Sequence, residues 1–166
     1  MRWYEWVANL CRKMGRVEEI PDRHTSEIYL KRYFILGNEK SKWFRILLHN
    51  IRLGDTDGPH DHPWAFLSII LAGGYYEWTQ HELKHRRPGT FYFRGARSFH
   101  RVQLDNNKEV WTLVVSFPRM SKSWGFLRRV NGKMKRILWT DYLGIKKQIK
   151  EKDQQEKKGL LSFLKI

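Results

Sequence analysis

The feature that most constrains the fold is a series of short apolar segments between residues 27 and 118, each bounded by turn-forming residues. Gly73-Gly74, Pro88-Gly89 and Asp105-Asn106-Asn107 are typical of tight turns between strands. Short strands at this regular spacing are typical of β-sandwiches and barrels, so we predict an all-β fold. The expected strands cover residues 27–36, 43–53, 64–71, 75–80, 90–94, 100–104 and 110–117.

The two ends of the chain differ from this strand-rich region. We assign residues 1–22 to an N-terminal amphipathic helix and linker, because apolar residues recur there at helical spacing. This helix can dock on the barrel, bind a partner or lie on a membrane surface. Residues 23–144 are expected to form the barrel with a C-terminal extension, and residues 145–166 a charged tail, helical or disordered.

Three histidines form the clearest candidate site. His60 and His62 are two positions apart, and side chains at that spacing on a strand point to the same side. His100 lies on a later segment that a small barrel would bring back beside them. Imidazoles are common ligands of divalent metal ions. The sequence therefore predicts a metal site of His60, His62 and His100, while Asp61 points away and is expected to brace a turn.

The sequence around these histidines resembles the two motifs of the cupin superfamily of small jelly-roll barrels. The matching positions are Gly54, His60, His62, Gly73, Gly89 and His100. The resemblance covers roughly residues 27–118. It implies an all-β cupin jelly-roll barrel with short N- and C-terminal helices.

The glutamate ligand of the first cupin motif is replaced here by Phe66. The three remaining histidines resemble the site of cysteine dioxygenase and related cupins, which implies Fe(II), with zinc, nickel or manganese as alternatives. In that family an arginine on the first part of the barrel binds the substrate carboxylate, and Arg32 occupies a comparable place. Residues that support catalysis there would fall near Thr112, Val114 and Ser116, and none of these matches the family.

A closer resemblance is to uncharacterised cupin proteins of bacteria and their viruses. The shared pattern is present here as His60-Asp-His-Pro-Trp64, Gly73-Gly-Tyr-Tyr-Glu77, Arg86-Arg-Pro-Gly89, His100-Arg-Val102, Trp111-Thr-Leu113, Phe117-Pro-Arg119 and Trp124-Gly-Phe126. It extends beyond the barrel but implies no particular activity.

Charged residues near the histidines are candidates for contacts with a substrate. Three neutral imidazoles leave a divalent ion its full charge, which favours an anionic ligand. Arg32, Arg94 and Arg97 are therefore candidate substrate-binding residues. Glu77, our candidate catalytic residue, stands among aromatic residues; it can orient a ligand histidine, act as a base, or be a surface charge paired with an arginine.

The resemblance and the composition together leave two functions open. One is a metal-binding cupin, a three-histidine iron-dependent oxygenase acting on a small anionic substrate. The other is a non-catalytic basic cupin that binds nucleic acid or a protein partner, because the chain carries a net charge of +15. The single cysteine, Cys11, and the lack of a transmembrane apolar run indicate a cytoplasmic protein, and a homodimer is compatible with both functions.

Overall fold

The structure of the chain, a computed structural model, describes residues 1–144. Within this range one α-helix precedes eleven strands that pair antiparallel, and residues 139–144 are helical. The elements are α1 (Trp3–Lys13), β1 (Val17–Pro21), β2 (Ile28–Leu36), β3 (Arg45–Ile51), β4 (Trp64–Ala72), β5 (Tyr75–Thr79), β6 (Leu83–Arg86), β7 (Phe91–Arg94), β8 (His100–Leu104), the short 3-10 helix η1 (Asp105–Asn107), β9 (Val110–Arg119), β10 (Gly125–Val130) and β11 (Lys133–Leu138). No helix in this described part is long and apolar enough to cross a bilayer.

Two sheets form the barrel. The larger has the strand order β1-β2-β3-β9-β4-β7, and the smaller has the order β6-β5-β8. Both contribute side chains to one core, because alternate residues of each strand point inward. Its buried members are Phe34, Leu47, Phe66, Ile70, Tyr75, Tyr92, Val102, Leu104, Val110 and Val114. The predicted all-β jelly-roll fold is confirmed.

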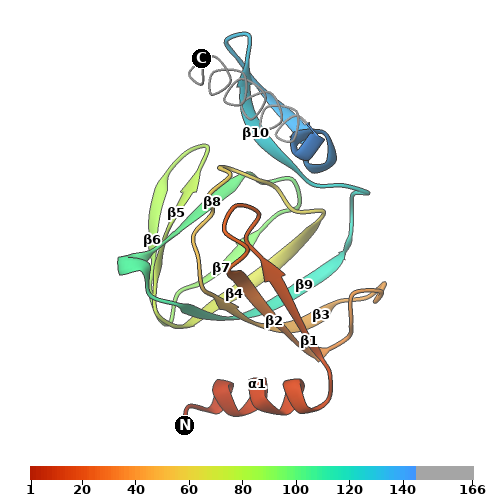
Figure 1. Cartoon of the computed structure of the whole chain (residues 1–166), viewed down its shortest axis with the longest axis vertical. Helices are drawn as coiled ribbons and strands as arrows, with labels where there is room; N and C mark the ends of the chain where they lie inside the picture. The colour runs from red at the N-terminus through yellow and green to blue at the C-terminus, as the bar shows by residue number, and fades with distance from the viewer. Residues whose placement is uncertain (145–166) are drawn as a thin grey trace, which may run out of the picture.

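The N-terminal helix packs on the outside of the larger sheet. Its residues Tyr4, Ala8 and Cys11 are buried against a second apolar cluster that includes Tyr33 and Leu48. Figure 1 shows α1 along one end of the barrel, with β10 at the opposite end. The hairpin of β10 and β11 forms a separate ribbon beside the barrel mouth.

The strand predictions from sequence agree with the observed strands for seven segments, but four further strands were not predicted. Residues 17–21, which the sequence places in the linker, form β1 and pair with β2. The short strand β6 and the basic hairpin of β10 and β11 lack an alternating apolar pattern. Strand β9 also continues through Pro118 to Arg119. The predicted tail, residues 145–166, lies outside the described residues.

The turn between β4 and β5 requires glycine. Gly73 has φ +71°, and a Cβ placed there would lie 2.4 Å from the carbonyl oxygen of Glu109. Both the positive φ and this close approach exclude a larger residue. The turn reverses the chain from the larger sheet into the smaller one and so helps to set the position of Glu77 on β5.

Candidate metal centre

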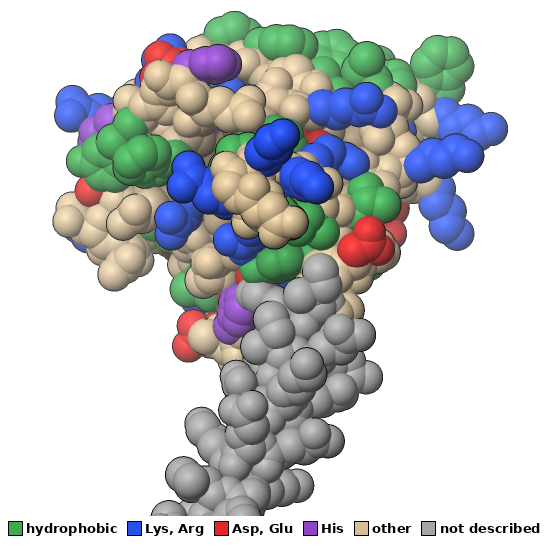
Figure 2. Space-filling view, turned by 90° about the horizontal axis from the view of Figure 1, so that it is seen from above, with side chains coloured by type: hydrophobic (Ala, Val, Ile, Leu, Met, Phe, Trp, Pro, Cys, Tyr) green, Lys and Arg blue, Asp and Glu red, His purple; other side chains and the backbone are tan. Residues whose placement is uncertain are grey.

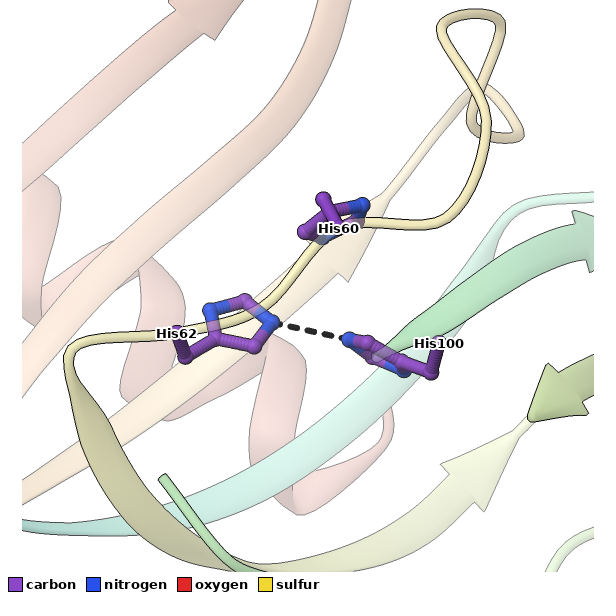
Figure 3. A group of neighbouring side chains, drawn as sticks. All are labelled: His60, His62 and His100. Atoms are coloured by element: carbon purple, nitrogen blue, oxygen red, sulfur yellow. Dashed lines mark hydrogen bonds between the residues drawn. The ribbon is translucent and has the colours of Figure 1, made fainter. Parts of the chain in front are cut away.

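The barrel brings the three predicted histidines together. The ring centroids of His60, His62 and His100 are 5.0 Å apart in each of the three pairs. One ligand nitrogen from each ring lies within 4.8 Å of the others. Figure 3 shows the rings converging from two segments of the chain, and the Nε2 atoms of His62 and His100 are 2.8 Å apart. Among the described residues, these three histidines are the group of side chains placed closely enough to hold one metal ion.

The main chain fixes two of these residues relative to each other. The N–H of His60 donates to the carbonyl oxygen of His100 at 2.8 Å, and the N–H of His100 donates back at 3.0 Å. His60 thus forms an isolated bridge to the first residue of β8, although it is not part of a longer strand. The carbonyl oxygen of His62 accepts a hydrogen bond from the N–H of Arg97 at 3.1 Å.

Asp61, between the two histidines, points away from them. Its buried carboxylate accepts hydrogen bonds from the N–H of Gly125 at 2.6 Å and from Arg136 Nε at 2.7 Å. These contacts join the histidine segment to the β10–β11 hairpin. The side chain therefore braces the loop, in agreement with the sequence-based expectation.

The imidazoles of His60 and His62 are suited to bind a metal because their surroundings favour the neutral form. Burial, together with the nearby His100 and His60, holds the pKa of His62 well below its usual value. Burial also lowers the pKa of His60, although the carboxylate of Asp55 acts in the opposite direction. Neutral rings offer the lone pairs that a cation requires. Together with a nitrogen of His100 they form a group of three ligand atoms for one divalent ion, which does not select among iron, zinc and nickel.

Glu77 supports the site from behind His100. Its side chain is fully buried, at 0% exposure, so it is not a surface charge. His100 Nδ1 lies 2.9 Å from Glu77 Oε1, and Arg86 Nε donates to Oε2 at 2.8 Å. Arg94 forms a further ion pair with the same carboxylate. With Nδ1 held by Glu77, His100 presents Nε2 to the other histidines.

The carboxylate of Glu77 is ionised in this environment. Burial acts to raise its pKa, but the hydrogen bonds from His100 and Arg86 and the charge of Arg94 outweigh burial and lower the pKa to about 2. Glu77 therefore acts as a hydrogen-bond acceptor for His100. The carboxylate contacts Nδ1 of His100 and does not belong to the group of three ligand atoms from His60, His62 and His100.

A cavity of about 320 Å³ opens beside the three histidines. Its walls are largely aromatic and aliphatic, and include Trp64, Phe66, Tyr75 and Tyr92. Phe66 packs edge-on to His62 with ring centroids 5.3 Å apart. The space is large enough for a small organic molecule.

Arg32 and His49 line the same cavity, as does Arg23. Arg32 and His49 are cross-strand neighbours on β2 and β3. Arg32 Nη1 is paired with Glu18 at 2.7 Å, but Arg32 Nε and His49 Nε2 are buried without a hydrogen-bond partner. Burial, followed by the charges of Arg32 and Arg45, holds the pKa of His49 well below its usual value. Unsatisfied buried polar atoms are uncommon and suggest that a ligand completes them.

The other predicted substrate-binding arginines lie elsewhere. Arg94 is engaged with Glu77, and Arg97 is exposed and contributes its backbone near His62. Of the three candidates, Arg32 lines the cavity. His49 was not among the predicted site residues. Its pairing with Arg32 follows from the register of the β2–β3 hairpin, which composition alone does not reveal.

The fold and the site together define a cupin-like jelly-roll barrel with a three-histidine pocket. No family model matches the chain, and no curated protein matches it. Among solved structures, the polyketide cyclase RemF from Streptomyces resistomycificus is 15% identical, with a TM-score of 0.54, and the match covers 71% of this chain and 84% of RemF.

Two further structures show the same kind of likeness. The DMSP lyase DddQ from Ruegeria pomeroyi DSS-3 is 16% identical, with a TM-score of 0.52, and the match covers 65% of this chain and 56% of DddQ. An RmlC-like cupin from Shewanella frigidimarina NCIMB 400 is 15% identical, with a TM-score of 0.47, over 63% of this chain and 86% of that protein. At these identities, the likenesses to RemF and DddQ support the fold and leave the activity open.

Proposed function

We propose that this protein is a metal-dependent enzyme that binds a small anionic substrate inside the barrel. The observation that carries the proposal is the convergence of His60, His62 and His100 on a cavity whose wall also presents the unpaired nitrogens of Arg32 and His49. A cation and an anion-binding wall within one apolar cavity are the elements of a site that orients a charged substrate.

His60, His62 and His100 would hold the ion, for which Fe(II) is our first choice and zinc, nickel and manganese are the alternatives. A bound ferrous ion would supply redox chemistry toward dioxygen, whereas a bound zinc ion would supply Lewis acidity. The carboxylate-free ligand set would leave the ion strongly positive and so attract an anionic group.

The remaining residues would position the substrate. Arg32 would donate from Nε to an anionic oxygen, and neutral His49 would donate or accept one hydrogen bond beside it. Phe66 and Trp64 would exclude water from the reacting groups. Glu77 acts through His100 by fixing the ring, so in this proposal it is a positioning residue. Arg94 and Arg97 would act from outside the cavity, through Glu77 and the His62 loop respectively.

The first test is metal content, measured by mass spectrometry on untagged full-length protein. We expect near-stoichiometric metal in the wild type and its loss in His60→Ala/His100→Ala. His81→Ala removes an exposed histidine outside the cluster and should keep the metal. If neither wild type nor control binds iron, zinc, nickel or manganese after reconstitution, the proposal is wrong.

The second candidate, a nucleic-acid-binding protein, rests on charge. Figure 2 shows Lys and Arg side chains spread over the face seen from above, in keeping with the net charge of +15. Phosphate contacts make such binding strongly salt-dependent. Salt-dependent binding to DNA or RNA that is unchanged in His62→Ala would favour this function. Oxygen consumption that is lost in His62→Ala would favour the enzyme.

A further inference from the structure

Helix α1 has two apolar faces, and the barrel covers one of them. Tyr4, Ala8 and Cys11 face the larger sheet and are buried. The opposite stripe consists of Trp3, Trp6, Leu10 and Met14, the last at the C-cap, with exposures of 55%, 55%, 44% and 61%. These four residues recur at three- and four-residue intervals, so they fall within about 80° of the helix circumference.

The exposed stripe is bordered by positive charge. Arg2, Arg12 and Lys13 are exposed on or next to the helix. Glu5, the acid within α1, is paired with Arg2 at 2.7 Å, so this pair adds no net charge, and Arg12 and Lys13 make the helix net positive. An apolar stripe with two tryptophans and a basic border is typical of helices that lie in the headgroup region of a membrane.

The charge pattern favours a lipid surface over a second copy of this chain. Two copies meeting through this stripe would bring the basic residues of both helices together, which is unfavourable. Anionic headgroups would instead neutralise Arg12 and Lys13 while the indole rings enter the interfacial layer. Figure 1 shows α1 at the outer end of the barrel, where a flat surface can reach it.

We propose that the outer face of α1, formed by Trp3, Trp6, Leu10 and Met14, docks this protein on the surface of an anionic phospholipid membrane. The helix would lie in the plane of the interface and would not cross the bilayer. This attachment is independent of the metal centre, because it uses side chains that do not line the cavity.

The test is cosedimentation of the full-length protein with vesicles of phosphatidylcholine alone and of phosphatidylcholine with about one third phosphatidylserine. We expect binding to the anionic vesicles that weakens with added salt, and about tenfold weaker binding or less for Trp3→Ser/Trp6→Ser. Lipids with brominated chains should quench the tryptophan fluorescence of the wild type more than that of the variant.

The matched control is Phe91→Ser/Phe93→Ser, which removes two exposed aromatic residues from β7. It should bind vesicles like the wild type, and both variants should keep the wild-type melting temperature. Absence of wild-type binding to anionic vesicles, or equal binding by Trp3→Ser/Trp6→Ser, would overturn the proposal. So would a wild-type dimer that Trp3→Ser/Trp6→Ser converts to monomer without any vesicle binding, because the stripe would then be a protein interface.

Discussion

Replacing Glu77 with glutamine tests whether this buried carboxylate organises the histidine site. The substitution keeps the shape of the side chain and removes its charge. Arg86 and Arg94, each with a side chain 12% exposed, would then face a neutral amide. His100 Nδ1 would also face a neutral amide oxygen, a weaker acceptor than the carboxylate. We expect losses in both stability and metal affinity.

Two routes give a similar magnitude for the loss of stability. The pKa of Glu77 is lowered from 4.5 to about 2, and at about 1.4 kcal/mol per pKa unit the ionised form contributes roughly 3 kcal/mol. Removing one partner of a buried ion pair costs about 3–5 kcal/mol in other proteins. Loss of a partner that orients a metal-binding histidine typically weakens metal affinity by about 10–100-fold.

The assay is urea unfolding at pH 7 in the presence of a chelator, followed by metal titration of the folded protein. Glu82→Gln is the matched control, because Glu82 makes an exposed ion pair with Lys84 on the same β5–β6 hairpin. That control should stay within about 0.5 kcal/mol of the wild type. A Glu77→Gln variant as stable as the control, with unchanged metal affinity, would refute the reasoning.

Three further predictions concern the frame of the site. Asp61→Ala should cost about 2 kcal/mol and increase amide exchange in the β10–β11 hairpin, because Arg136 loses its buried partner; unchanged exchange would contradict this. Gly73→Ala should cost at least about 2 kcal/mol, measured by thermal unfolding, since its Cβ meets the Glu109 carbonyl; a wild-type melting temperature would contradict it. The pKa of Asp22 is lowered, since hydrogen bonds from neighbouring N–H and hydroxyl groups outweigh burial, which acts to raise it. Asp22→Ala should therefore be less stable than the wild type by about 2 kcal/mol above about pH 4. This difference in unfolding free energy should narrow at lower pH, where the carboxylate of Asp22 is protonated in the folded wild type as well; a difference that does not depend on pH would contradict this.

The strands of the barrel were predictable because their signals are local. The apolar run that ends at Gly73-Gly74 identifies β4, and the Pro88-Gly89 turn marks the start of β7, without any tertiary information. Strands β10 and β11 were not predictable in this way, because β11 is almost entirely exposed and its pairing depends on the partner strand. A basic hairpin with little buried surface carries no clear apolar period.

The candidate site was predictable in part. The spacing of His60 and His62 and the later His100 are readable from the sequence, whereas the hydrogen bond between Glu77 and His100 depends on the register of β5 against β8. The same limit applies to His49. Its place in the cavity wall follows from long-range pairing, which a single sequence does not specify.

The reciprocal backbone hydrogen bonds between His60 and His100 have a consequence for how the pocket would recruit a cation. The main chain sets the spacing of these two residues in the folded protein. The conformational entropy of ordering them is therefore lost during folding and not when the metal binds. Ring rotation would then adjust the fit only locally. A cation that enters through the cavity would therefore meet a pair of ligands whose main chain needs no further ordering.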